Sequence, residues 1–173
     1  LNPKKREVAN VEDDTLVSFV PMARVDDVLG TMDVSEVKKL KDVRKGYTYF
    51  AENDVVFAKI TPCMENGKSA IARNLINGIG FGTTEFHVLR SGPLTIPEWL
   101  HLFVRHREFR EEAKKSMYGA AGQQRVPVDF LREATIPVPP LAEQRKIVAR
   151  IEELTHRAEE ARKLRQAAVD KVR

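Results

Sequence analysis

The final stretch of the chain, from Pro137 onward, constrains its fold more than any other segment. Residues 137–140 read Pro-Val-Pro-Pro, and such a run favours an extended approach because each proline fixes φ and disfavours helix in the preceding residue. Pro140 suits a first helical turn, and Glu143 complements the positive helix N-terminus. Residues 141–173 contain neither Gly nor Pro, so we predict one helix on the order of 50 Å long.

The apolar residues of this predicted helix have the period of a coiled coil. They alternate in steps of four and three residues, with Arg165 interrupting the series, and comprise Ile147, Ile151, Leu154, Ala158, Ala161, Ala168 and Val172. The pattern fits either a helix folded against its own domain or a helix that pairs with another helix. Because a rod of this length exceeds what the remaining residues could cover, we favour pairing with a second helix.

Composition restricts the class of protein. An apolar fraction of 42% with 31% charged residues is ordinary for a globular domain, and no apolar run approaches the roughly 20 residues needed to span a bilayer. Cys63 is the single cysteine, which excludes an internal disulfide framework and fits a reducing compartment. We therefore expect a cytoplasmic protein without membrane contact.

The order of apolar runs and turn residues predicts an α+β fold: a globular domain over residues 1–136 with a mixed or mostly antiparallel sheet and helices, a proline-rich junction over 137–140, and a long coiled-coil helix over 141–173. The expected strands cover residues 16–20, 46–50, 54–60, 69–72 and 80–89. A helix should begin near Pro97 with Thr95 as its cap, break near His106 and end at Met117. The polar stretch 33–45 fits either a loop or a short helix.

No catalytic constellation emerges from the sequence. Asn66-Gly67-Lys68-Ser69 resembles the end of a phosphate-binding loop, but Pro62 stands where that motif requires glycine. Cys63 is not spaced to pair with a histidine base, and the histidines and acids lack the spacing of strong metal sites. We expect no enzymatic activity, no cofactor and no bound metal.

Three polar loops instead carry the side chains that contact nucleic acid. Arg, Lys and Gln hydrogen-bond base edges, Thr and Lys suit phosphates, and glycine permits close approach of the backbone. A single loop of this kind is usually only solvated surface; three of them raise the expectation of a DNA-binding face. The residues expected to face DNA are Lys59, Thr61, Lys68, Thr83, Thr84, Lys115, Tyr118, Gln123, Gln124 and Arg125.

The segment Ile136 to Val148, Ile-Pro-Val-Pro-Pro-Leu-Ala-Glu-Gln-Arg-Lys-Ile-Val, resembles the junction between the target-recognition domain and the conserved spacer helix in specificity subunits of type I restriction-modification systems. Residues 59–68, 82–89 and 122–127 are similar to further segments of the same recognition domains. The resemblance thus covers most of the chain.

This resemblance implies a non-catalytic DNA-recognition subunit that directs methyltransferase (modification) and restriction subunits to a bipartite site on double-stranded DNA. Members usually carry two recognition domains and two long helices, whereas this chain has one of each. It is then either a half-subunit that forms a homodimer through its helix or a fragment that supplies one of two recognition domains. The alternative function is a coiled-coil assembly adaptor that binds partner helices without reading DNA.

Overall fold

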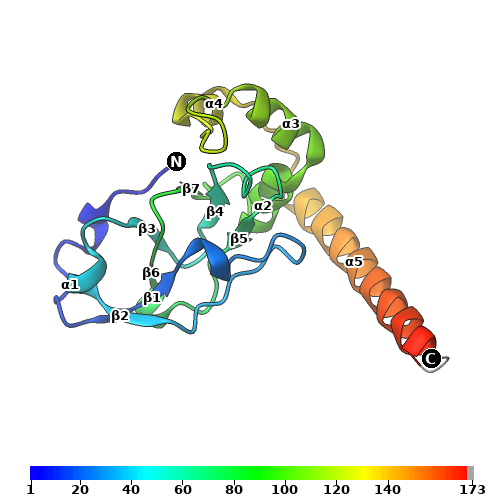
Figure 1. Cartoon of the computed structure of the whole chain (residues 1–173), viewed down its shortest axis with the longest axis horizontal. Coiled ribbons are helices and arrows are strands. Elements are labelled where there is room, and N and C mark those ends of the chain that lie inside the picture. Colours follow the sequence, from blue (N-terminus) through cyan, green and yellow to red (C-terminus); the bar gives the residue numbers. More distant parts are fainter. Residues whose placement is uncertain (171–173) are drawn as a thin grey trace.

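The computed structural model describes residues 1–170, with side chains through residue 167. Figure 1 shows a body of sheets and short helices from which one long helix projects. The strands are β1 (Leu16–Val20), β2 (Val37–Lys39), β3 (Thr48–Ala51), β4 (Val55–Ala58), β5 (Ser69–Ile71), β6 (Ile79–Gly82) and β7 (Phe86–Leu89). The helices are α1 (Leu40–Val43), α2 (Pro97–Arg105), α3 (Arg107–Lys115), α4 (Val128–Glu133) and α5 (Leu141–Asp170), with 3₁₀ turns η1 (Lys5–Val8), η2 (Met22–Arg24) and η3 (Ile76–Gly78).

The strands form two sheets, which confirms the α+β class but divides the single sheet that we expected. The first sheet has the order β2-β1-β6-β3 and is mixed, because β1 and β6 run parallel while the other pairs are antiparallel. The second sheet, β5-β4-β7, is antiparallel. Consecutive strands β3 and β4 therefore belong to different sheets.

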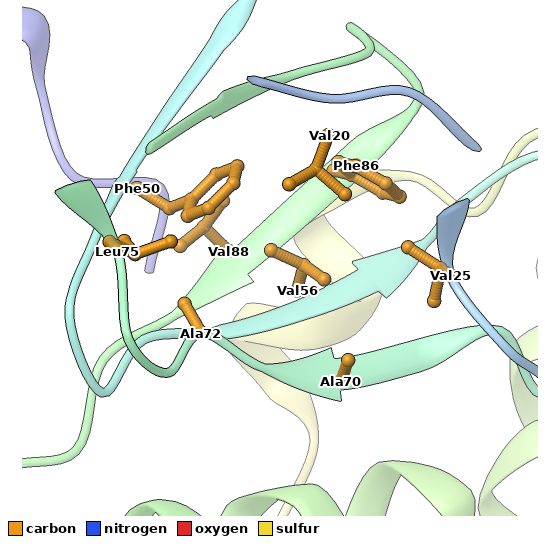
Figure 2. Close-up of a cluster of buried hydrophobic side chains, with 9 residues drawn as sticks. All are labelled: Val20, Val25, Phe50, Val56, Ala70, Ala72, Leu75, Phe86 and Val88. Atoms are coloured by element: carbon orange, nitrogen blue, oxygen red, sulfur yellow. The ribbon is translucent and has the colours of Figure 1, made fainter. Parts of the chain in front are cut away.

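A shared apolar core lies between the sheets. Figure 2 shows side chains of both sheets meeting there, among them Val20 and Phe50 from the first sheet and Val56 and Val88 from the second. In β4, Val56 faces this core while Val55 and Phe57 face the helices α2 and α3. Because successive strand side chains point to opposite faces, a strand that is buried on both faces reads as an unbroken apolar run.

Each sheet is covered on its other face. Val17, Phe19 and Tyr49 of the first sheet pack against Leu40 and Val43 of α1. Helices α2, α3 and α4 cover the second sheet through a cluster that also takes in Met64 and Val126. The segment 33–45, undecided from sequence, holds β2 and α1.

Two local predictions were wrong. Residues 80–89 form two strands, because a turn at Thr83 separates β6 from β7 and passes the chain from one sheet to the other. Thr95 does not cap α2; Ile96 occupies the N-cap, and its own side chain makes no capping hydrogen bond. The Thr95 hydroxyl oxygen instead accepts a hydrogen bond from the Gly92 backbone N–H, at 3.3 Å. The expected break near His106 is confirmed, since that residue separates α2 from α3.

The junction to α5 is fixed by a few buried groups. The Trp99 indole N–H donates to the Pro137 carbonyl at 2.8 Å, which anchors the extended proline segment to α2. Gln144 is fully buried: its side-chain amide donates to the carbonyls of Leu94 and Pro139, each at 2.8 Å, and accepts from the Ile96 N–H at 3.1 Å. Val148, one turn later, is also buried. These contacts set the direction in which α5 leaves the body.

Beyond this junction α5 projects from the body (Figure 1). Its described part is a single helix, as predicted, and Val172 lies outside the described residues. Ile147 is half-buried, whereas Ile151, Leu154, Ala158 and Ala161 are exposed; the surroundings of the Ala168 side chain are not described. Within residues 1–170, no helix combines the length and apolar character required to cross a membrane.

Candidate nucleic-acid interface

The three polar loops meet in one place. The Thr61 backbone N–H donates to the Gln124 carbonyl at 3.0 Å, and the Gln124 N–H donates to the Thr61 hydroxyl oxygen at 3.2 Å. Lys59 joins all three loops, since its N–H donates to the Glu85 carbonyl at 2.9 Å and its carbonyl accepts from the Val126 N–H at 2.8 Å. We call residues 59–61, 83–85 and 118–125 the three-loop cluster.

The third loop closes on itself before it joins the others. Tyr118 and Arg125 exchange two backbone hydrogen bonds, of 3.2 and 2.9 Å. Gly119 and Gly122 have φ of 122° and 78°, conformations that glycine adopts most readily. Between these anchors the loop is exposed, as is most of the Tyr118 side chain. The closure presents an aromatic ring and glutamine amides on a short, fixed loop.

Arg125 is held by Glu85 of the second loop. The arginine Nε and Nη2 donate to the two carboxylate oxygens at 2.9 and 2.8 Å, and Nη1 donates to the Gln123 carbonyl at 2.9 Å. The hydrogen bond from Arg125 lowers the pKa of Glu85 against the opposing effect of burial, and the same bond raises the pKa of Arg125. Both groups are therefore charged at neutral pH.

His87, a buried residue of β7, supports the three-loop cluster. Its Nε2 lies 2.9 Å from the Val126 carbonyl oxygen, which follows the third loop. Burial lowers the pKa of His87, so the ring is neutral at pH 7 and can donate Nε2–H to that carbonyl. The side-chain amide of Asn2 lies 3.4 Å from the other ring nitrogen. His87 thus links β7 to the loop.

Most residues predicted to face DNA lie in or beside this cluster. Lys59, Thr61, Thr83, Gln123, Gln124, Arg125 and Tyr118 belong to it, and Thr84 is exposed at the tip of the second loop. Lys115 is exposed at the end of α3 and pairs with Glu112 at 2.6 Å.

Lys68 lies apart from the cluster. Its ammonium donates to the carbonyls of Val25 and Met22, at 2.7 and 3.3 Å. These bonds tie the segment before β5 to the turn after η2. Because the charge is taken up by backbone carbonyls, we leave Lys68 out of the proposed interface.

The sequence did not indicate the contacts that two residues, Glu85 and Gln144, make in the folded chain. Glu85 was noticed only as part of a Thr-rich loop, although an acid beside an otherwise basic and polar set suggests a partner for an arginine. Gln144 was overlooked because it is polar, yet it stands four residues before Val148 and so shares its helix face. The spacing of four residues between Gln144 and Val148 was the signal in the sequence that could have identified Gln144 as a packed residue.

The residues considered for other chemistries lie outside the three-loop cluster. Gly67 has φ of 84° within a turn whose lysine is engaged as described, and Cys63 is half-buried. In the part of the chain that the structure describes, no three His, Cys, Asp or Glu side chains gather where they could hold a metal ion.

Comparison with known proteins places this geometry in a family. The family described as "Type I restriction modification DNA specificity domain" matches residues 3–167. The chain belongs to this family. It is 43% identical over 155 residues to the type I restriction enzyme EcoAI specificity subunit from Escherichia coli, and 39% identical over 156 residues to the EcoEI specificity subunit from the same organism. Each match covers 89% of this chain and 26% of the relative, so the chain spans about a quarter of the length of these specificity subunits.

Solved structures of the family have the same architecture. The HsdS subunit from Thermoanaerobacter tengcongensis matches with a TM-score of 0.75 and 26% identity, over 90% of this chain and 40% of that one. A chain described under "complex assembly and conformational transition of the type I R-M system" matches with a TM-score of 0.74 at the same identity and coverage. The α+β fold with its long C-terminal helix is therefore that of a specificity domain, and the family predicted by resemblance is confirmed.

Proposed function

We propose that this chain is a DNA target-recognition module of a type I restriction-modification system, and that the three-loop cluster contacts the duplex. In this proposal Gln123, Gln124 and Arg125 read bases, while Lys59, Lys115 and the threonines contact phosphate. The module has no catalytic role of its own. It acts in the cytoplasm and directs methyltransferase and restriction subunits to its site.

The observation that carries the proposal is the convergence of loops far apart in sequence. Lys59, Glu85 and Gln124 are brought together by backbone hydrogen bonds, so the donors and acceptors of the cluster are fixed before any ligand arrives. Fixed donors favour binding because less conformational entropy is lost on association. Base reading needs such directional groups, whereas phosphate contacts need mainly positive charge.

The exposed part of α5 supports a second element of the proposal, pairing with another long helix. Ile151 and Leu154 are 37% and 48% exposed, although they belong to the coiled-coil period. A second helix packed there would hold a second recognition domain at a fixed distance, and the second DNA contact would become intramolecular. That helix belongs to a second copy of this chain or to a second half of a longer subunit.

Selection of bound duplexes from a randomised library at low salt tests the proposal. We expect an enriched motif whose affinity falls steeply with salt concentration. An inverted pair of motifs at constant spacing indicates a homodimer, and a single short motif indicates one domain acting alone. No enrichment, together with no salt-dependent binding to any duplex, would contradict DNA recognition and favour the adaptor function instead.

A further inference from the structure

We propose that Glu85 is a positioning residue that aims the free edge of the Arg125 guanidinium at one guanine of the target sequence. This inference rests on the proposed function, because it names the base class that one part of the three-loop cluster reads. It adds a residue that contacts no base itself but determines which base Arg125 accepts.

The hydrogen bonds of Arg125 fix the orientation of its guanidinium. Glu85 occupies the side edge of Arg125, formed by Nε and Nη2, through hydrogen bonds of 2.9 and 2.8 Å. The Gln123 carbonyl takes a further N–H from Nη1, at 2.9 Å. These contacts from two directions fix the plane of the group and the direction in which its tip points.

Two donors of the Arg125 guanidinium remain after these contacts. A guanidinium has five N–H groups, and the contacts described take one each from Nε, Nη1 and Nη2. These hydrogen bonds leave one further N–H on each terminal nitrogen. A pair of parallel donors is the group that bonds O6 and N7 of guanine in the major groove. The arginine side chain is 39% exposed against 23% for Glu85, so the arginine is the more accessible partner.

The ion pair with Glu85 offsets the positive charge of Arg125. A carboxylate near DNA opposes binding, and an arginine whose charge is offset by a carboxylate is a weak phosphate contact. The pair therefore gives little non-specific affinity. Hydrogen bonding to a base edge depends less on net charge than phosphate binding does, and it is strengthened when the donor is held in a fixed orientation. The arrangement suits base readout better than phosphate binding.

Glu85 is itself held in place by hydrogen bonds of its backbone. Its backbone N–H donates to the Thr83 hydroxyl oxygen at 3.2 Å, and its carbonyl accepts from the Lys59 N–H at 2.9 Å. Glu85 is thus held by the second loop and the end of β4. The base-reading arginine of the third loop is thus aimed by a residue that is anchored to the second loop and to the chain after β4.

Affinities of the 173-residue chain for its selected duplex and for single-base substitutions of that duplex test this inference. The variants are Glu85→Gln, Arg125→Ala and the double variant. We expect Glu85→Gln and Arg125→Ala to relax discrimination at the same guanine by roughly ten- to a hundred-fold, and the double variant to relax it no further. Glu85→Gln should not lower overall affinity at low salt, because it removes a negative charge.

Glu98→Gln is the matched control. Glu98 also pairs with an arginine, Arg73, and its side chain is similarly shielded, at 29% exposed, but it lies on α2 outside the three-loop cluster. The Glu98→Gln variant should leave the base preference of the chain unchanged at every position of the duplex. Glu85→Asp keeps the charge and shortens the reach of the carboxylate, so it should relax discrimination at the same guanine. It serves in place of Glu85→Gln if thermal unfolding shows that Glu85→Gln does not fold.

The possible outcomes separate the two proposals. If Glu85→Gln raises affinity for all duplexes and preserves every base preference, Glu85 acts only through its charge and the inference is overturned. If Glu85→Gln and Arg125→Ala relax discrimination at different base positions, the positioning role is also wrong, although DNA recognition stands. Absence of sequence-dependent binding by the unaltered chain would overturn both proposals.

Discussion

At the scale of single residues, Gly80 shows how closely the ring of Phe50, its partner on the neighbouring strand β3, packs against its own sheet. It lies in β6 between β1 and β3, directly beneath the ring of Phe50. A Cβ at Gly80 would stand 2.1 Å from the nearest Phe50 ring carbon, far inside van der Waals contact. The ring is itself fully buried, so it cannot move aside without disturbing the shared core.

We predict that Gly80→Ala lowers the free energy of unfolding by about 1–3 kcal/mol, the usual cost of overpacking a core. Gly92→Ala is the control, because a Cβ there meets nothing within 4 Å and should change stability by less than about 0.5 kcal/mol. Urea unfolding of both variants measures the difference. Equal losses would show that Gly80 is not packed as described.

His101 gives the domain a dependence on pH. Burial lowers its pKa from 6.5 to about 4, against the opposing effect of the hydrogen bond with the Ser69 carbonyl. The unfolded chain therefore binds the proton more readily than the folded one. The stability contributed by neutral His101 is complete above pH 6.5 and is lost as the pH falls toward 4.

We predict that unfolding free energies measured between pH 7 and pH 4 fall more steeply in the unaltered chain than in His101→Gln. The extra loss should be on the order of 3 kcal/mol by pH 4. His156→Gln, which alters an exposed histidine of α5, should follow the unaltered chain. Parallel curves for the unaltered chain and His101→Gln would contradict a buried, neutral imidazole.

At this scale the sequence identified residue types better than it identified their roles. The polar residues of the three loops could be named because glycine, threonine and glutamine in loops indicate contact with polar ligands. The partnership of Arg125 with Glu85 could not be named, since 40 residues separate them and only the folded chain brings them together. Lys68 could not be excluded for the same reason, because its carbonyl partners lie more than 40 residues earlier.

At the scale of secondary-structure elements, α5 is the clearest case of a pattern that predicts an element but not its environment. The absence of Gly and Pro and the period of its apolar residues predicted one long helix. The same period assigned Ile147 and Ile151 to a seam for a partner helix, and it did not indicate that Gln144 and Val148 are buried at the junction with the body. Periodicity reports apolar residues, and a buried amide that satisfies its hydrogen bonds escapes it.

We predict that Gln144→Ala destabilises the junction by about 1–3 kcal/mol, because it leaves the Ile96 N–H and two carbonyls without their buried partner. Glu143→Ala, at the exposed neighbouring position, should change stability by less than about 0.5 kcal/mol. Unfolding is followed by the fluorescence of Trp99, which anchors the proline segment. We expect this signal to be lost at a lower denaturant concentration in Gln144→Ala than in the unaltered chain. Identical unfolding midpoints would show that Gln144 does not fix α5.

Element boundaries failed where the chain changes sheets. Residues 80–89 read as one apolar strand, but Gly82 has no room for a side chain next to the Val20 carbonyl, and the turn at Thr83 redirects the chain. Strand periodicity is the same on both sides of such a turn. Nothing local distinguishes one long strand from two short ones in different sheets.

At the scale of the whole molecule, charge is unevenly distributed. Residues 141–173 hold nine Lys/Arg against six Asp/Glu, so most of the net charge of +4 lies on the helix. Any attraction of the globular body for DNA must therefore come from a local group of cations. Lys59 and Lys115 are the cations expected to supply it.

We predict that Lys115→Ala reduces the slope of log affinity against log salt by about 1, as expected when one phosphate contact is lost. Base preference should be unchanged. Lys163→Ala removes the same charge from the exposed surface of α5 and should leave the slope unaltered. Equal reductions for both variants would indicate a general effect of net charge instead of a contact at Lys115.

We propose that the three-loop cluster, and not the projecting helix, contacts DNA. Hydrogen exchange of backbone amides, measured with and without the selected duplex, tests it most directly. We predict slower exchange in residues 59–61, 83–85 and 118–125 on addition of DNA, and unchanged exchange in residues 150–167 of α5. Protection confined to α5, with the three loops unaffected, would contradict the account.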